Sequence, residues 1–350
     1  MPFSHHSHSG QFCAHAKDTL EECILAAISK NLRTFCLTEH MPRNEPRDLY
    51  PEEIEASFTP ETLHARFAEY YKTALELREK YKSQITLLIG FEVDWIRPSS
   101  LDEITRLREM YDFDIFVGSV HHVDEIPIDF SREVFEQAIT TVEALDTRGD
   151  GDAVCHNGVE ISRFGEIQVT GSKGEERLFE AYFDTQYAML TALRPPVIGH
   201  FDLIRLKATD YSVDFKTMPK VWDKVVRNVK FIAGYGGMVE INSAAVRKGW
   251  EYPYPGPDVL RVVVGEGVKL VMSDDSHGVA QVGFGYARCL EYLAEQGVAE
   301  VWYYEWKGNE RRVQDGVLKT ADGVPLPKIG AANVEAKSIR LDDLKGVVVA

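Results

Sequence analysis

Histidine is the residue type whose positions in this chain point most directly to chemistry. Of the 11 histidines in 350 residues, most follow short apolar segments or lie near the N-terminus, in HSHSGQFCAH, LTEH, GSVHH, IGHFD and SDDSH. Imidazole suits zinc, iron, cobalt or manganese, and a carboxylate can join two such ions. The candidate metal ligands are His6, His8, His15, His40, Glu92, one or both of His121 and His122, His200, Asp275 and His277.

The spacing of these residues favours a cluster of ions over a single ion. In an extended segment, side chains two residues apart lie on the same side, as do His6 and His8. Up to seven histidines and two carboxylates exceed the three or four ligands that one zinc ion needs. Taken alone, each element has a structural interpretation, such as a core His40 or a salt-bridged Glu92. Their joint occurrence at five strand ends favours two or three ions.

The elements that must position these residues are short apolar strands that alternate with amphipathic helices. We expect strands at Thr34–His40, Ile85–Trp95, Asp114–Val123, Pro195–Ile204, Met238–Ser243 and Lys269–Ser273. We expect helices at Lys17–Asn31, Pro60–Lys80, Leu101–Tyr111, Arg132–Leu145, Leu178–Leu193, Met218–Tyr235 and Gly256–Gly267.

This alternation predicts an α/β fold with a parallel sheet, closed as a TIM-like barrel. A doubly wound open sheet is the alternative, but no GxGxxG motif follows the first strand. In a barrel, the carboxyl ends of the strands converge on one face, and that face holds the active site. The candidate ligands should therefore meet there.

We expect a single barrel domain over residues 1–350, with a polar, glycine-rich insertion at about 146–177 and a polar tail after about 306. His5, His64 and His156 fall outside the ligand pattern, so we expect them on the surface or in loops.

Composition disfavours several classes of protein. A net charge of −16, from 39 Lys and Arg against 55 Asp and Glu, argues against a nucleic-acid partner, because such proteins usually carry a basic excess. No segment approaches the ~20 apolar residues of a membrane span, and the N-terminus lacks a secretory pattern. Five cysteines without a CxxC motif predict free thiols in the cytoplasm. The sequence leaves the oligomeric state open.

The motifs HSHSGQFCAHA, LTEH, GFEVD, GSVHH, GHFDLIR and SDDSH, in this order, resemble those of the PHP (polymerase and histidinol phosphatase) superfamily. The resemblance covers roughly residues 3–300 and is greatest to the histidinol-phosphate phosphatases, with GSVHHVDEIPIDF and SDDSHG similar to the fungal type. It implies a distorted (β/α)7 barrel that holds three divalent ions, of zinc, iron or manganese. It also implies hydrolysis of L-histidinol phosphate to L-histidinol and phosphate, a step of histidine biosynthesis.

The resemblance divides the ligands among the ions. The three implied sets are His6, His8, Glu92 and Asp275; Glu92, His121 and His200; and His15, His40 and His277. Glu92 would then bridge two ions. The motif spacing selects Asp275 over Asp274 and His121 over His122, and Glu39 receives no ligand role.

Hydrolysis of a phosphate monoester requires charge neutralisation, a nucleophile and a stabilised leaving group. Glu92 and Asp275 are expected to serve catalysis through the ions they hold, and His122 is a candidate general acid. The planar guanidinium groups of Arg205 and Arg247 are expected to bind phosphate oxygens, as the resemblance also implies.

Three acidic residues that lie at or just past strand ends could meet the amine or imidazole of such a substrate: Asp124, Asp129 and Asp202. The main alternative function is a PHP-type phosphoesterase or 3′-exonuclease with another substrate, which would need a basic groove for the strand. A non-catalytic metal-binding protein is the third possibility, although all nine candidate ligands are present.

Overall fold

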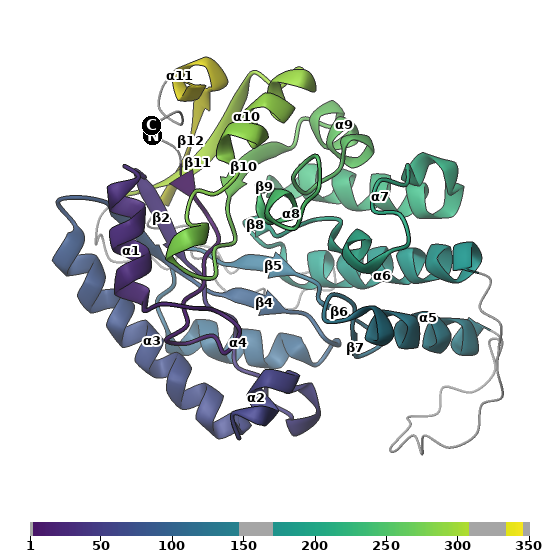
Figure 1. The fold of residues 1–350 in the computed structure, drawn as a ribbon, viewed down its shortest axis with the longest axis horizontal. Coiled ribbons are helices and arrows are strands. Elements are labelled where there is room, and N and C mark those ends of the chain that lie inside the picture. The colour runs from purple at the N-terminus through teal and green to yellow at the C-terminus, as the bar shows by residue number, and fades with distance from the viewer. Residues whose placement is uncertain (1–2, 147–170, 308–333, 346–350) are drawn as a thin grey trace.

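The computed structural model describes residues 3–146, 171–307 and 334–345, and parallel strands lie at its centre with helices around them (Figure 1). The central strands are β1 (Phe3–Ser4), β2 (Thr34–Leu37), β3 (Thr86–Ile89), β4 (Glu92–Asp94), β5 (Val117–Ser119), β8 (Val197–Ile198), β9 (Met238–Asn242) and β10 (Lys269–Ser273). Their residues are almost all buried, as expected for parallel strands that are covered on both faces.

Hydrogen bonds between neighbouring strands run around a closed ring. The parallel pairs are β1–β2, β2–β3, β4–β5, β5–β8, β8–β9 and β9–β10. The ring is joined between β1 and β10 where His5 N donates to Met272 O at 3.3 Å and His8 N donates to Ser276 O at 2.7 Å. The α/β barrel predicted from the sequence is therefore confirmed.

β3 and β4 form one continuous side of the barrel, interrupted only at Gly90 and Phe91. A Cβ atom added to Gly90 would lie 2.3 Å from the carbonyl oxygen of Ile115, so only glycine fits this close approach of two backbones. β3 pairs with β2, and β4 pairs with β5. Glu92, the first residue of β4, therefore lies between the ends of β2 and β5.

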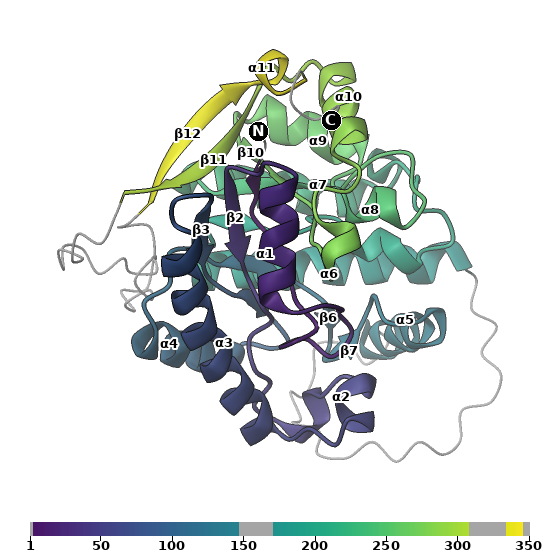
Figure 2. The ribbon, with the colours of Figure 1, turned by 60° about the vertical axis from the view of Figure 1, so that its left-hand side comes forward.

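Helices follow the strands along the chain. They are α1 (Leu20–Ser29), α2 (Pro51–Glu55), α3 (Pro60–Tyr81), α4 (Ser100–Met110), α5 (Arg132–Asp146), α6 (Gly171–Leu193), α7 (Pro219–Tyr235), α8 (Ala244–Arg247), α9 (Pro257–Gly265) and α10 (Tyr286–Glu295). The longer ones cover the outside of the barrel, whereas the short α2 and α8 lie beside the carboxyl ends of the strands. In the turned view of Figure 2, α1 and α3 lie outside β2 and β3. Local sequence sets the helix ends: Thr19 and Glu22 form a capping box on α1, and α7 ends at Gly236, whose φ is 80°.

A hairpin of β11 (Glu300–Trp306) and β12 (Val334–Arg340) extends the sheet beyond β10, and α11 (Leu341–Lys345) follows it. His5 ties this hairpin to the barrel. Its Nδ1–H donates to Met272 O at 3.0 Å, and its Nε2 accepts the N–H of Tyr304 at 3.2 Å. Burial lowers the pKa of His5 to about 4, so the ring is neutral, as both bonds require.

Some expectations need correction. His5 is fully buried and not a surface residue, whereas His64 is only half-buried on α3 and His156 lies outside the described residues. The sequence does not predict β1, β11 or β12, and the expected insertion at 146–177 overlaps α6, which already begins at Gly171. The tail after about 306 contributes β12 and α11. A second, small hairpin joins β6 (His122–Val123) to β7 (Ile126–Pro127). Among the described helices, none combines the length and apolar character of a membrane span.

Candidate metal centre

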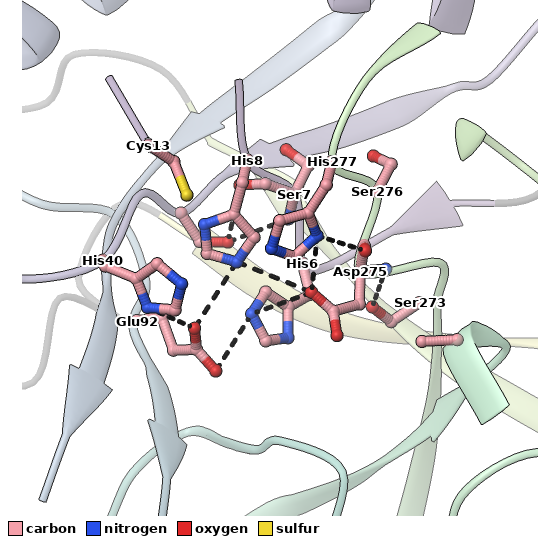
Figure 3. Close-up of polar contacts among 12 residues, drawn as sticks. His6, Ser7, His8, Cys13, His40, Glu92, Ser273, Asp275, Ser276 and His277 are labelled. Atoms are coloured by element: carbon pink, nitrogen blue, oxygen red, sulfur yellow. Dashed lines mark hydrogen bonds and ion pairs between the residues drawn. The ribbon is translucent and has the colours of Figure 1, made fainter. Parts of the chain in front are cut away.

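The nine predicted ligands meet at the carboxyl ends of the barrel strands. Figure 3 labels six of them: His6, His8, His40, Glu92, Asp275 and His277. Each of the nine follows or begins a strand, except His15, which lies in the loop between β1 and α1. In strand order they are His6 and His8 after β1, His40 after β2, Glu92 at the start of β4, His121 after β5, His200 after β8, and Asp275 and His277 after β10. The backbone φ angles of His200 and Asp275 are 21° and 47°, a strained region that clusters at functional sites.

Glu92 lies at the centre of the cluster and is almost fully buried. Its Oε1 lies 3.2, 3.4 and 3.1 Å from the Nε2 atoms of His6, His121 and His200. Its Oε2 lies 3.4 Å from His8 Nε2 and 2.9 Å from His40 Nδ1. The two oxygens therefore face two different sets of histidines, which is the arrangement of a carboxylate that bridges two ions.

Asp275 joins a second part of the cluster. Its Oδ1 lies 3.7 Å from His6 Nε2, 3.5 Å from His8 Nε2 and 3.6 Å from His277 Nδ1. The neighbouring Asp274 has a different role, since its Oδ1 accepts hydrogen bonds from Ser4 Oγ at 2.9 Å and from the Ser276 N–H at 3.1 Å. The geometry therefore places Asp275, and not Asp274, with the histidines.

A third group forms where the N-terminal loop meets the end of β10. His15 Nε2 lies 3.2 Å from His277 Nε2 and 3.3 Å from Cys13 Sγ. The donor atoms of His8, Cys13, His40 and His277 all lie within 4.8 Å of one another. Sequence reasoning does not single out Cys13. Its position two residues before His15, in the loop that follows His6 and His8, could have indicated that it lies near the ligands.

The donor atoms of the cluster fit metal ions better than they fit one another. His6 Nε2 and both ring nitrogens of His8 and His40 are buried without a hydrogen-bond partner among the described residues. Their contacts with Glu92 are short but lack hydrogen-bond geometry, so the lone pairs point to shared positions between the side chains. Buried polar atoms are rarely left unpaired, and nitrogen with oxygen is the ligand chemistry of zinc, iron or manganese.

Two carboxylates behind the ligands hold the histidine rings in place. Glu240 Oε1 accepts from His6 Nδ1 at 2.9 Å, and Asp94 Oδ1 accepts from His121 Nδ1 at 2.6 Å. Such partners fix the tautomer, so that Nε2 presents its lone pair to an ion. Sequence reasoning assigns neither residue a role, although Asp94 shares a strand face with Glu92 two residues earlier.

The electrostatics keep the cluster ionised. Burial opposes the ionisation of Glu92, but His6, His121 and His40 hold its pKa well below its usual range. Burial also works against a charged His121, yet Glu92 and Asp94 raise its pKa to about 10. Without ions this imidazole carries a proton that a metal ion must displace, so metal affinity should increase with pH.

A cavity of about 490 Å³ borders the cluster, a size typical of small-molecule sites. Its lining joins metal-ligand candidates with polar and apolar side chains from other loops. These include Tyr50, Glu52, Asp129, Phe130, Leu203, Arg247 and Lys248.

His122 does not line this cavity, although the sequence predicts a catalytic role for it. It is buried and stacks on Tyr50, with ring centroids 6.0 Å apart. Burial lowers its pKa to about 4, so it holds no proton to donate at neutral pH. The geometry therefore argues against His122 as a general acid.

Arg205 is also displaced from its expected role. It is 1% exposed and lies outside the cavity lining. Its Nε donates to Asp202 at 2.7 Å, one terminal nitrogen donates to both oxygens of Asp258 at 2.8 Å, and the other donates to the carbonyl oxygen of Val213. The guanidinium also lies 3.5 Å from the ring centre of Phe215. With its donors occupied in the core, Arg205 is a structural residue and is not placed to bind phosphate.

Arg247 lies where the sequence predicts it, at the cavity wall. Its two terminal nitrogens each donate to a backbone carbonyl, of Asp274 and Asp275, at 2.9 Å. Because guanidinium has five N–H donors, these two bonds leave others for an anion. The bonds also fix Arg247 against the strand end that carries Asp275.

Comparisons with known proteins identify the family of this chain. The family model described as PHP domain matches residues 4–244. A protein of Schizosaccharomyces pombe named "Probable histidinol-phosphatase" is 41% identical over 87% of this chain and 90% of its own length. The Saccharomyces cerevisiae protein named histidinol-phosphatase is 33% identical over 83% of this chain and 88% of its own. A solved histidinol phosphate phosphatase from Lactococcus lactis, complexed with zinc, L-histidinol and phosphate, shares the fold with a TM-score of 0.59 at 18% identity, over 86% of this chain and 95% of that one. The chain belongs to the PHP family.

Proposed function

We propose that this chain is a histidinol-phosphatase, a metal-dependent phosphoric monoester hydrolase that releases L-histidinol and phosphate in histidine biosynthesis. The observation that carries this proposal is Glu92, whose two oxygens face separate histidine sets beside a cavity that also presents Arg247. The 41% identity to a protein named for this activity, over most of both chains, supports the choice of substrate.

The nine ligand candidates would hold three divalent ions of zinc, iron or manganese. When bound, such ions supply positive charge for a phosphate dianion and lower the pKa of water, which hydrolysis of a phosphate monoester needs. Glu92 would hold two ions together, while Glu240 and Asp94 keep the Nδ1 protons of His6 and His121 and so direct their Nε2 atoms inward.

The phosphate would also contact the chain directly. Arg247 offers the N–H donors that its bonds to the strand end leave over, and Lys248 follows it in the cavity wall. A planar guanidinium matches two phosphate oxygens at once, whereas an ammonium acts as a point charge. These local charges let an acidic protein accept an anion, since distant surface charges are screened within ~8 Å.

We also assign the protein to the cytoplasm. The four cysteines in the described residues, Cys13, Cys23, Cys36 and Cys289, are unpaired and buried, which suits a reducing compartment.

The test is phosphate release by the purified, metal-loaded protein from three substrates. We expect kcat/KM to be highest for L-histidinol phosphate, much lower for nitrophenyl phosphate, and negligible for a single-stranded oligonucleotide. Preferential release of nucleotides from a 3′ end would overturn the proposal in favour of an exonuclease. Equal kcat/KM values for the two monoesters would indicate a phosphatase that is not specific for L-histidinol phosphate.

A further inference from the structure

The cavity contains one carboxylate that neither the ligand cluster nor a salt bridge uses. Four carboxylate residues line it: Glu52, Glu92, Asp129 and Asp275. Glu92 and Asp275 belong to the ligand cluster, and Glu52 accepts from His15 Nδ1 at 2.8 Å. Asp129 has no hydrogen bond or ion pair with any residue in the part of the chain that the structure describes, although it is half-buried.

The other two acidic residues considered from the sequence are excluded by their positions. Asp202 is fully buried and bonded to Arg205 at 2.7 Å. Asp124 is exposed on the turn between β6 and β7 and does not line the cavity. Of these three acidic residues, only Asp129, in the segment between β7 and α5, lines the cavity.

Asp129 lies close enough to the ligand cluster to act on the same small molecule. Asp129 lines the same cavity as the ligand candidates His121 and His200. The cations of the lining, Arg247 and Lys248, form no ion pair with Asp129 within the described residues. The cavity lining therefore holds two cations that suit phosphate and one carboxylate that forms no ion pair with either of them among the described residues.

We propose that Asp129 binds the protonated primary amine of the substrate and so selects phosphate esters that carry an ammonium group near the phosphate. This proposal rests on the proposed function, because L-histidinol phosphate carries its amine on the carbon next to the phosphate-bearing methylene group. The amine is a better match than the imidazole, since an amine is protonated at neutral pH whereas imidazole, with an ordinary pKa of about 6.5, is mostly neutral.

The neighbouring residues suit the remainder of such a substrate. Phe130, directly after Asp129, is 45% exposed and lines the cavity with Leu203, so an apolar surface lies beside the carboxylate. A large exposed aromatic side chain at a cavity wall commonly contacts a ligand. An ester with a carboxylate in place of the amine would instead meet the negative charge of Asp129.

The test compares two esters that differ only in the amine, L-histidinol phosphate and its deamino analogue imidazolylpropyl phosphate. Wild-type protein should prefer the amine-bearing ester by about 10- to 100-fold in kcat/KM, the usual size of a hydrogen bond to a charged group. Asp129→Asn, which keeps the shape and removes the charge, should lose this preference by slowing only the amine-bearing ester. Asp129→Glu, which retains the charge, should keep part of the preference.

Asp124→Asn is the matched control, since it removes an exposed carboxylate five residues earlier and asparagine tolerates the positive φ of 47° at that position. It should leave the preference unchanged. Metal content and Tm of each variant must equal those of the wild type. Inhibition gives a second measurement: Asp129→Asn should weaken the binding of L-histidinol, but not that of inorganic phosphate.

An Asp129→Asn variant that slows both esters equally, or retains the amine preference, would overturn the assignment of Asp129. A wild type that cleaves other phosphate monoesters but not L-histidinol phosphate would instead refute the proposed function. In that case, inhibition by L-histidinol and by a simple aminoalkyl phosphate would test whether Asp129 binds the amine. Loss of amine-dependent inhibition in Asp129→Asn would support this role of Asp129, and unchanged inhibition would refute it.

Discussion

Replacing Arg205 with alanine should destabilise the fold and leave the chemistry of the folded protein nearly intact. The guanidinium is 1% exposed, and its two acidic partners, Asp202 and Asp258, are 0% and 5% exposed. Removing one partner of a buried ion pair leaves an uncompensated charge and typically costs about 3–5 kcal/mol. Here two carboxylates lose their cation, although the N–H groups of Gly256 and Phe215 still bond to them at 2.9 and 2.8 Å.

We therefore expect Arg205→Ala to lower the free energy of unfolding by about 3–5 kcal/mol, a large fraction of the about 5–15 kcal/mol of an ordinary domain. Denaturant unfolding of the metal-loaded protein measures this value. The kcat/KM per folded, metal-loaded molecule should stay within about threefold of wild type, which is less than 1 kcal/mol.

Arg247→Ala is the matched comparison and should show the opposite result. Its side chain borders the cavity and, within the described parts of the chain, bonds only to two carbonyl oxygens, so its loss should change stability little. Loss of a charge-assisted contact to the reacting phosphate should lower kcat/KM by about 30- to 1000-fold, or 2–4 kcal/mol. Lysine at this position should rescue only part of the rate, because it lacks the planar fork.

A double-mutant cycle with Asp258→Asn tests the cause of the instability. If the cost comes from the lost ion pair, Arg205→Gln and Asp258→Asn should couple by about 0.5–3 kcal/mol. An Arg205→Ala protein with wild-type stability and a severely reduced kcat/KM would refute the structural role and restore the phosphate contact expected from the sequence.

Three further outcomes follow from the candidate metal centre and from His5. Glu92→Gln should lower kcat by at least about 1000-fold and reduce the metal content more than His15→Asn does, because the two oxygens of Glu92 face both histidine sets. Elemental analysis and steady-state kinetics measure these effects. A Glu92→Gln protein with normal rates and full metal content would contradict the bridging role of Glu92. Dialysis against a chelator should abolish phosphate release and lower Tm, since ions that bind only the folded state stabilise it, and fewer than two ions per active chain would contradict a cluster. His5, with a folded pKa of about 4 against about 6.5 unfolded, contributes stability that is complete above pH 6.5 and is lost as the pH falls towards 4. Between pH 7 and 5 this loss amounts to about 2 kcal/mol of unfolding free energy. In His5→Gln the unfolding free energy should therefore depend less steeply on pH than in the wild type. If the wild type and His5→Gln show the same pH dependence, His5 is not its cause.

The convergence of the strand-end ligand candidates could be predicted because their position depends on local pattern alone. Each of His40, His121 and His200 ends an apolar segment, and the carboxyl ends of parallel strands meet whatever the connecting helices do. The barrel follows from the same alternation. β1 escapes this reasoning because only two residues, Phe3 and Ser4, have strand geometry, and its pairing partners lie far along the chain.

The roles of Arg205, His122 and Glu240 could not be predicted because they depend on distant partners. Arg205 meets Asp258, 53 residues later, and His6 meets Glu240 after 234 residues. Asp202, three residues earlier in GHFDLIR, also bonds to Arg205, but a local pair of this kind does not show whether the guanidinium turns into the core or into the site. His121 and His122 are adjacent in the sequence, yet the His121 ring points to the ligand cluster and the His122 ring stacks on Tyr50.

The join between the first and last barrel strands has a consequence for the order of events during protein synthesis. Ser4 Oγ donates to Asp274 Oδ1 across 270 residues, and His6 and His8 lie two and four residues after Ser4. At about 5–20 residues per second, the ribosome needs roughly 15–55 s after releasing these first histidines to deliver their last partners. Until then the nascent chain carries an open barrel and an incomplete set of ligands. If the candidate ligands hold metal ions, those ions would reach their complete set of ligands only after translation has passed Asp275 and His277, and metal loading would be a late step in the maturation of the protein.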